Sequence, residues 1–274
     1  MSRRIDRLLI TGAAGRIGRS LRQRLAGDFS LIRLTDILPM EPAGAGEEVA
    51  VSDLADGPAM ARLCEGIDAI IHLGGNPREV PWEETVPPNI LGVINLWEGA
   101  RKAGVDRVLY ASSNHATGFY RRDDRLDHNS PSRPDGRYGL TKAFGEDLAQ
   151  LYAYKYGVRG LMIRIGSFQP EPLDERMLAT WLSHDDCERL IRNGLEADYT
   201  YEIVYGISRN TRAWWDNANA YRLGYDPRDD SERFAAAVVG KTTADPIAET
   251  FQGSVFASVE FSGPPTRVPP YERS

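Results

Sequence analysis

The chain has 274 residues, 42% of them hydrophobic, and its 39 acidic and 33 basic side chains give a formal net charge of -6 at pH 7. A chain of this length can bury one large core, with or without a small appended lobe. The acidic balance and the scattered basic residues argue against nucleic acid or an anionic membrane as a partner, because both are bound mainly through clustered Lys and Arg.

The cysteines and histidines lack the spacing of a disulfide framework or a metal site. Cys64 and Cys187 lie far apart, and the four histidines show no metal-binding pattern, so we expect neither feature. The apolar stretch after the charged start is too short for a signal peptide or a membrane span. These features predict a cytoplasmic protein without a metal.

Short β-rich runs alternate with helix-length stretches in the first part of the chain. The expected strands cover residues 8–11, 31–35, 48–51, 69–72, 108–111 and 161–165, and the expected helices cover 17–25, 90–103 and 140–156. This order predicts right-handed crossovers and an α/β fold with a doubly wound parallel sheet, the Rossmann fold. After residue 165 the pattern loosens. We therefore expect residues 1–165 to form a dinucleotide-binding domain and residues 166–274 to form a small substrate-side lobe packed on the same core.

The first expected strand leads into Gly12-Ala13-Ala14-Gly15-Arg16-Ile17-Gly18, a GxxGxxG spacing at the start of a helix. Gly12 suits a tight turn, Gly15 lets the backbone approach a pyrophosphate, and Gly18 permits close packing of helix on strand. The N–H groups at the helix N-terminus can donate to the phosphates. A tight turn alone could also use these glycines, but their place between strand and helix favours dinucleotide binding.

Asp36 ends the second expected strand, where an acidic side chain accepts hydrogen bonds from the ribose hydroxyls and repels a 2′-phosphate. The sequence therefore predicts NAD rather than NADP. Arg33 could moderate this preference, although a solvent-facing strand position is the simpler interpretation. Asp53-Leu54 follows the third strand near the expected adenine, and Leu73-Gly74-Gly75 follows the fourth, where small residues let the chain run beside the cofactor.

Tyr138 and Lys142 open a helix-length segment with an i, i+4 spacing that places both on one face. The ammonium, and the positive nicotinamide of NAD+, would stabilise the phenolate and lower the pKa of Tyr138, which makes it a candidate general base. A half-buried tyrosine above a surface lysine would give the same spacing. Ser113 ends the fifth strand, where ligands of open α/β sheets bind, and its hydroxyl favours the catalytic interpretation.

The glycine motif, Asp36, Asp53, Ser113, Tyr138 and Lys142 together resemble the extended short-chain dehydrogenase/reductase family, also called the NAD-dependent epimerase/dehydratase family, over nearly the whole chain. Within it the sequence is most similar to the uronate dehydrogenases, in segments that include residues 111–115, 133–136, 164–167, 183–186 and 214–217. The resemblance implies NAD-dependent oxidation of a uronic acid, such as glucuronate or galacturonate, at C1 to the aldarolactone. It also implies a homo-oligomer.

The resemblance implies roles for individual residues. It assigns to the cofactor Arg16, Ile17, Asp36, Asp53, Leu54, Leu73, Gly74, Gly75, Lys142 and Phe168. It assigns to the substrate Ser113, Asn114, His115, Ser167 and Arg176. His115 could instead pack behind the strand end, and Arg176 could pair with acidic neighbours on the surface. Pro77 departs from the pattern, since these enzymes typically carry a serine there and proline offers neither a hydroxyl nor an N–H. The particular uronic acid stays open.

Two other functions stay open. A nucleotide-sugar epimerase or dehydratase uses the same fold, but few residues follow the sixth strand for the nucleotide-binding lobe that such enzymes typically carry. A redox-sensing regulator would bind NAD without turning it over. Such regulators typically lack the tyrosine and lysine pair that this chain keeps.

Overall fold

The computed structural model describes residues 4–272. Seven parallel strands form one sheet in the order β3-β2-β1-β4-β5-β6-β9, and β7 pairs with β8 separately. The strands are β1 (Arg7–Thr11), β2 (Leu31–Asp36), β3 (Glu47–Val51), β4 (Ala69–His72), β5 (Arg107–Ser113), β6 (Arg159–Ile165), β7 (Ser167–Phe168), β8 (Trp181–Leu182) and β9 (Tyr201–Gly206). The six predicted strands are confirmed, and the doubly wound parallel sheet is the predicted fold.

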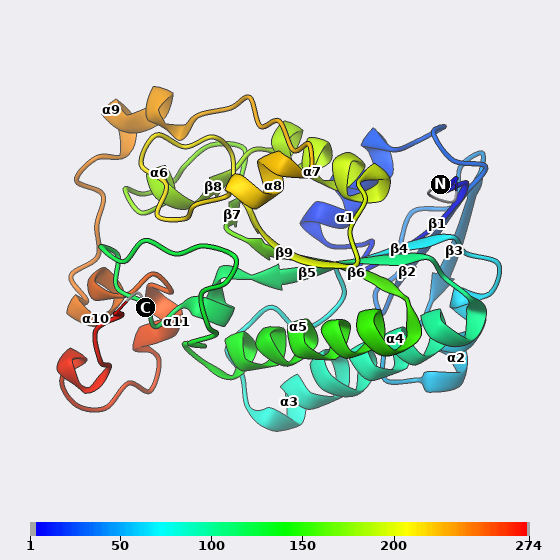
Figure 1. Ribbon diagram of the computed structural model, residues 1–274, viewed down its shortest axis with the longest axis horizontal. Helices are drawn as coiled ribbons and strands as arrows, with labels where there is room; N and C mark the ends of the chain where they lie inside the picture. Colours follow the sequence, from blue (N-terminus) through cyan, green and yellow to red (C-terminus); the bar gives the residue numbers. More distant parts are fainter. Residues whose placement is uncertain (1–3, 273–274) are drawn as a thin grey trace.

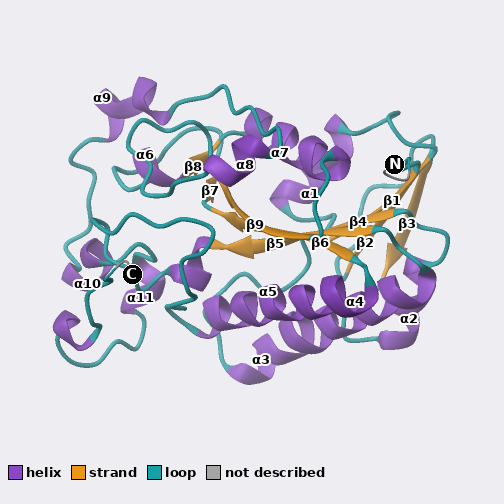
Figure 2. Ribbon diagram, viewed as in Figure 1, coloured by secondary structure: helices purple, strands orange, loops and turns teal. Residues whose placement is uncertain are grey.

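Helices cover both faces of the sheet, as Figures 1 and 2 show. One face carries α2 (Gly57–Cys64), α4 (Gly92–Ala103) and α5 (Arg137–Tyr156), and the other carries α1 (Arg16–Arg24), α7 (His184–Glu196) and α8 (Ala218–Arg222). The remaining elements are short: α3 (Trp82–Val86), η1 (Pro87–Leu91), η2 (Asn114–Thr117), α6 (Met177–Thr180), η3 (Ser231–Phe234), α9 (Ala235–Val238), α10 (Pro246–Thr250), α11 (Val255–Ser258) and η4 (Pro265–Arg267). Among the described residues, no helix is both long and apolar enough to cross a bilayer.

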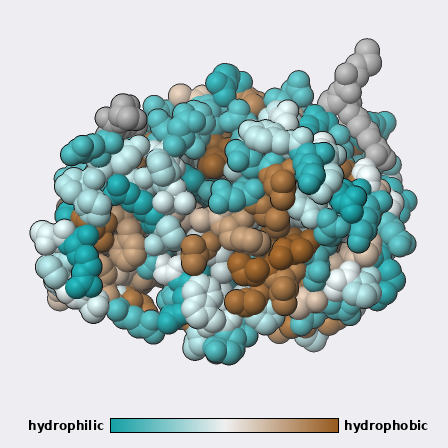
Figure 3. All heavy atoms as spheres, turned by 60° about the horizontal axis from the view of Figure 1, so that its bottom comes forward, coloured by the Kyte–Doolittle hydropathy of each residue, from teal (hydrophilic) through white to brown (hydrophobic). Residues whose placement is uncertain are grey.

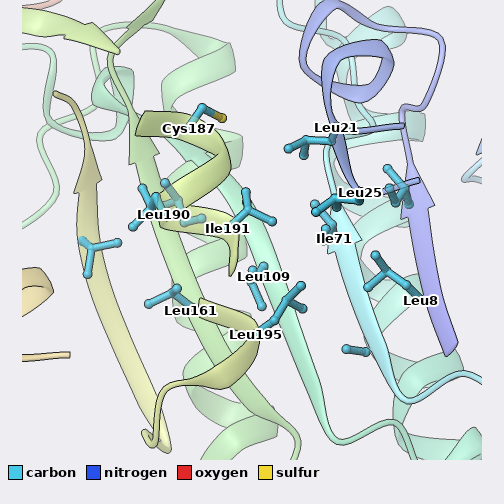
Figure 4. Packing of buried hydrophobic residues seen from close by; sticks show 14 of the residues in the cluster. Leu8, Leu21, Leu25, Ile71, Leu109, Leu161, Cys187, Leu190, Ile191 and Leu195 are labelled. Carbon is cyan, nitrogen blue, oxygen red and sulfur yellow. The ribbon is translucent and has the colours of Figure 1, made fainter. Parts of the chain in front are cut away.

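The strands carry apolar side chains on both faces of the sheet, because helices bury both faces. On one face, Leu109 of β5 and Leu161 of β6 pack under Leu190 and Ile191 of α7, with Leu21 of α1 beside them (Figure 4). On the other face, the core includes Trp97 of α4, Tyr110 of β5 and Tyr152 of α5. Burial of these side chains fixes the register of helices on the sheet and thereby the positions of the strand ends.

The chain after residue 165 does two things. It returns to the sheet, since α7 packs on it and β9 pairs with β6. It also forms small helices, α6 and α9 to α11, that gather beyond the carboxyl ends of β5 and β6 (Figure 1). The division at residue 165 stays a prediction, and the structure places β9 and α7 in the same core as the first six strands.

Candidate active site

A pocket of about 740 Å³ opens at the carboxyl ends of the strands, around the point where the strand order reverses between β1 and β4. Ligands of doubly wound sheets bind at such a point. The residues assigned to the cofactor from sequence all line it: Gly12, Gly15, Arg16, Ile17, Gly18, Asp36, Asp53, Leu54, Leu73, Gly74, Gly75, Tyr138, Lys142 and Phe168. Ser113, Asn114 and His115 also line it, whereas Ser167 and Arg176 are not among its lining residues.

The glycine turn after β1 leaves an open cradle at the start of α1. Gly12 has a φ of 69°, and a side-chain carbon there would lie 2.6 Å from the backbone nitrogen of Gly74. Gly15 is the N-cap of α1, whose first turn has neither a capping side chain nor an acidic residue. The N–H groups of this turn are therefore available to an anion, which fits the pyrophosphate of a dinucleotide.

Asp36 stands at the end of β2 with its carboxylate fixed by the backbone. Oδ2 accepts the N–H of Ala14 at 2.9 Å, and Oδ1 accepts the N–H of Leu38 at 3.0 Å. A carboxylate has further lone pairs for the hydroxyls of a ribose. Arg33 is turned away, because its guanidinium donates to Glu48 and to the carbonyl of Leu63. The residues present fit NAD, and Arg33 does not reach the pocket.

Tyr138 and Lys142 lie on the first turns of α5, and burial acts on both. Lys142 Nζ donates to the carbonyl of Ala111 at 2.7 Å and lies 5.5 Å from the centre of the Tyr138 ring. Burial lowers the pKa of Lys142 to about 8, and the charge of Glu146 opposes this shift. Burial likewise raises the pKa of Tyr138 to about 12, while a hydrogen bond with Ser113 opposes the rise.

From the sequence, Lys142 was expected to lower the pKa of Tyr138. In the chain without cofactor this expectation is wrong, because the pKa is raised. Sequence spacing shows that an ammonium is near, but not that the phenol is desolvated or that the ammonium points to a backbone carbonyl. Desolvation disfavours the charged phenolate, and here it outweighs the opposing hydrogen bond with Ser113.

Glu79, which the sequence did not indicate, caps the helix that carries Tyr138. The N-cap Gly136 has no side chain to offer. Glu79 Oε1 accepts the N–H of Arg137 at 2.9 Å, and Oε2 accepts the N–H of Tyr138 at 3.0 Å. The guanidinium of Arg137 adds an ion pair at 3.2 Å. A carboxylate from the loop after β4 thus satisfies the first N–H groups of α5 and complements the helix dipole.

A second contact joins the same loop to α5. Asn89, in the π-helical turn η1, accepts the N–H of Asn76 at 2.7 Å and donates to its carbonyl at 3.0 Å. Its amide also donates to Thr141 Oγ1 at 3.1 Å. Pro77 lies between these anchors and lines the pocket, so its neighbours, rather than a hydroxyl of its own, hold the loop in place.

Arg176 is held by polar contacts to Gln252, Ser167 and Asn114. Its Nε and Nη2 donate to the carbonyl of Gln252 at 2.9 and 2.7 Å, and its Nη1 lies 3.4 Å from Ser167 Oγ. In the amide orientation that satisfies both ends, Asn114 donates to the carbonyl of Ile165 and accepts from Arg176 Nη2, each at 3.0 Å. Burial lowers the pKa of Arg176 to about 10, and acidic neighbours oppose the shift. Within the described residues its hydrogen-bond partners are Gln252, Ser167 and Asn114 rather than the acidic neighbours considered from the sequence.

The comparisons with known proteins agree with this geometry. The model of the NAD dependent epimerase/dehydratase family matches residues 8–215, and the chain belongs to this family. A uronate dehydrogenase of Pseudomonas putida is 51% identical, over 92% of this chain and 96% of that protein. An NAD-dependent glucose-6-phosphate dehydrogenase of Haloferax volcanii is 38% identical, over 83% of this chain and 95% of that protein. The solved structure of a mutant uronate dehydrogenase from Agrobacterium tumefaciens complexed with NAD superposes with a TM-score of 0.89 at 43% identity, covering 93% and 98% of the two chains.

Glu79→Gln should weaken the N-terminus of α5, because glutamine has one acceptor oxygen for two N–H groups. We expect a loss of about 1 kcal/mol in the free energy of unfolding, on the scale of losing a helix cap, measured by urea denaturation. Glu260→Gln is the matched control, since Glu260 pairs with Arg137 on the surface, with 67% of its side chain exposed, and caps nothing. Equal losses in the two variants would contradict the capping role.

Proposed function

We propose that the chain oxidises a uronic acid, such as glucuronate or galacturonate, at C1 to the aldarolactone with NAD as the oxidant. The observation that carries this proposal is one pocket lined at one end by the glycine cradle and Asp36 and at the other by Ser113, Tyr138 and Lys142. Relatives named uronate dehydrogenase, 44 to 51% identical over most of the chain, support the same substrate class.

The residues that would hold NAD follow from the pocket. The N–H groups at the start of α1 would face the pyrophosphate, with Arg16 beside them, and Asp36 would accept from the adenosine ribose. Asp53 and Leu54 would border the adenine, Lys142 would donate to the other ribose, and Leu73, Gly74, Gly75 and Phe168 would line the remaining wall. When bound, NAD+ supplies the acceptor for the hydride that leaves C1.

The chain's own residues handle the proton and the orientation of the sugar. Tyr138 Oη accepts the proton of the C1 hydroxyl, and the bond between C1 and its oxygen becomes the carbonyl of the lactone. Ser113 holds that oxygen by a hydrogen bond, so the hydroxyl stays within reach of the phenolate. Since burial raises the pKa of Tyr138 to about 12, the base depends on positive charge near its oxygen, and Lys142 is the cation that the chain provides.

Arg176 is the residue proposed to receive the carboxylate of the sugar acid. A guanidinium makes charge-assisted hydrogen bonds to a carboxylate, and Nη1 is the end left for one, because Gln252 and Asn114 take the hydrogens of Nε and Nη2. Gln252 and Asn114 already fix the orientation of this side chain, so little rotamer freedom would be lost on binding. Ser167, next to Arg176 Nη1, would add a hydroxyl on the same side.

Tyr138→Phe should retain NAD binding and lose at least about 100-fold in turnover, the usual scale for removing a general base. The absorbance of NADH at 340 nm with glucuronate and galacturonate measures turnover, and fluorescence titration measures NAD binding. Ser113→Ala should lose less, because the proton acceptor remains. Near-normal turnover of the phenylalanine variant would remove Tyr138 from the mechanism.

The cofactor preference should depend on Asp36. We expect NAD to be preferred over NADP, and Asp36→Ala should narrow the gap mainly by raising KM for NAD, because the ribose loses its acceptor. Arg33→Ala is the control, since Arg33 is engaged with Glu48. A wild-type enzyme that prefers NADP would overturn the assignment.

Arg176→Ala should cost roughly 2 to 4 kcal/mol in kcat/KM toward a uronate, on the scale of losing a charged hydrogen-bond partner. The loss should be much smaller toward the corresponding neutral aldose. Arg176→Lys, which keeps the charge but not the fork, should fall between. If both substrates suffered equally, Arg176 would be a structural residue only.

We further propose a cytoplasmic homo-oligomer that associates through the helices of one sheet face. Cys64 and Cys187 are unpaired and buried, which suits a reducing compartment. Apolar side chains gather on the face that α3 to α5 present (Figure 3), and Leu140, Leu151 and Tyr154 of α5 are 47%, 49% and 68% exposed. Light scattering of the wild type should give a multiple of the chain mass, and a monomer would contradict this.

A further inference from the structure

Asp135 is a buried carboxylate that the roles above do not use. It lies just before α5, and its side chain has no exposed surface. Its Oδ2 lies 2.7 Å from Nδ1 of His115, and its Oδ1 has no hydrogen-bond partner among the described residues. A buried carboxylate is costly unless donors satisfy it. His115 therefore supplies the side-chain donor on which this charge depends.

Three glycines from separate segments enclose the carboxylate. They are Gly118 after η2, Gly139 in α5 and Gly253 before α11, and a side-chain carbon on any of them would crowd Asp135. None of them has a left-handed φ, so close approach rather than backbone freedom requires glycine here. The backbone is thus built around the Asp135 side chain and leaves it little room to turn.

The ring of His115 is fixed on its other sides by aromatic contacts. Phe256 of α11 stacks on it with ring centres 4.1 Å apart, and Tyr138 meets it edge to face at 5.8 Å. His115 also lines the pocket. Because Nδ1 faces Asp135, Nε2 is the ring nitrogen left for a ligand.

We propose that Asp135 is a positioning residue that holds His115 in its Nδ1-protonated tautomer, so that Nε2 accepts a hydrogen bond from a hydroxyl of the sugar acid. An ionised carboxylate only accepts, so the nitrogen facing it carries the hydrogen, and in the neutral ring the other nitrogen is then an acceptor. The part that concerns the sugar rests on the proposed function, whereas the tautomer rests on the chain alone.

This arrangement would orient the substrate as well as read one hydroxyl. An acceptor backed by the charge of Asp135 repels the carboxylate of the sugar acid, which leaves Arg176 as its cationic partner. A site built to bond a hydroxyl rejects an analogue that lacks it, because the buried acceptor is then left without a donor. His115 would thus determine specificity at a position other than C1.

The tautomer can be observed without turnover, by NMR of the full chain labelled with 15N-histidine at a pH where the rings are neutral. Comparison with His115→Gln assigns the His115 signals. We expect the Nδ1–H tautomer in the wild type and a mixture in Asp135→Asn, because an amide can either accept from or donate to Nδ1. A wild-type ring protonated on Nε2, or an unchanged ring in Asp135→Asn, would overturn the proposal.

Asp186→Asn is the matched control for loss of a buried carboxylate. Asp186 is fully buried and accepts the N–H groups of Arg228 and Asp229, far from any role in the pocket. It should leave the His115 signals unchanged. If Asp135→Asn does not fold, the wild-type spectrum alone still decides which nitrogen carries the hydrogen.

Kinetics test the recognition of the hydroxyl. Against a set of uronates that each lack one hydroxyl other than that at C1, the wild type should lose at least about 100-fold in kcat/KM for one member. Asp135→Asn should lose about 10- to 100-fold on the full uronate, the scale for partners that orient histidine ligands, and should narrow that particular gap. If the wild type lost the same factor in kcat/KM for every member of the set, the proposal that His115 recognises one hydroxyl would be overturned. A wild type that oxidises no uronate would refute the proposed function, and the NMR result would still decide the tautomer.

Discussion

Burial of Tyr138 and Lys142, the pair proposed to be catalytic, is the constraint on which the rest of the site depends. Desolvation disfavours the charged forms of both side chains, raising the pKa of Tyr138 to about 12 and lowering that of Lys142 to about 8. Neighbouring groups oppose each shift in part, through Ser113 at the phenol and Glu146 near the ammonium. Glu146 is itself buried and held by two bonds from Arg164, a pair behind the pocket that is costly to break. In a site with little water the interactions between charges are stronger, because the dielectric constant is lower.

Helix α5 is the element through which the site is assembled. Its N–H groups rest on Glu79, and its Thr141 is joined to the loop after β4 by Asn89. The carboxylate of Asp135, just before the helix, fixes His115. The loop after β4 and the segment around His115 are thus both held by contacts to α5 or to Asp135 just before it, and α5 carries Tyr138, the proposed base. Small errors in placing reacting groups are expensive, and one rigid helix with several anchors reduces them.

Sequence reasoning succeeded where local pattern decides and failed where long-range contacts do. The glycine turn, Asp36 at a strand end and the i, i+4 spacing of Tyr138 and Lys142 are local patterns, and the pocket contains all of them. The N-cap of α7 is also a local pattern, since Ser183 Oγ accepts the N–H of Asp186 three residues further on. Glu79 gave no signal, because a carboxylate in a loop is usually solvated. Asp135 lay in one of the segments of resemblance, residues 133–136, but nothing nearby in the chain revealed that His115 is its partner. The shift at Tyr138 was misjudged for the same reason, since burial is a property of the packed molecule.

The residues proposed to bind the substrate are held in place by the C-terminal part of the chain, which is not part of the nucleotide-binding motif. Gln252 is fully buried, and its amide accepts from Trp215 while donating to the carbonyls of Arg121 and Asp124. Its backbone carbonyl then takes both bonds from Arg176. The guanidinium therefore depends on a segment close to the end of the chain, and four residues further on Phe256 stacks on His115. The segment 252–256 thus positions Arg176, which is proposed to bind the carboxylate, and covers His115, which is proposed to bind a hydroxyl. A substitution in this segment should alter substrate choice before it alters cofactor binding, because the glycine cradle and Asp36 belong to β1, α1 and β2 at the other end of the pocket.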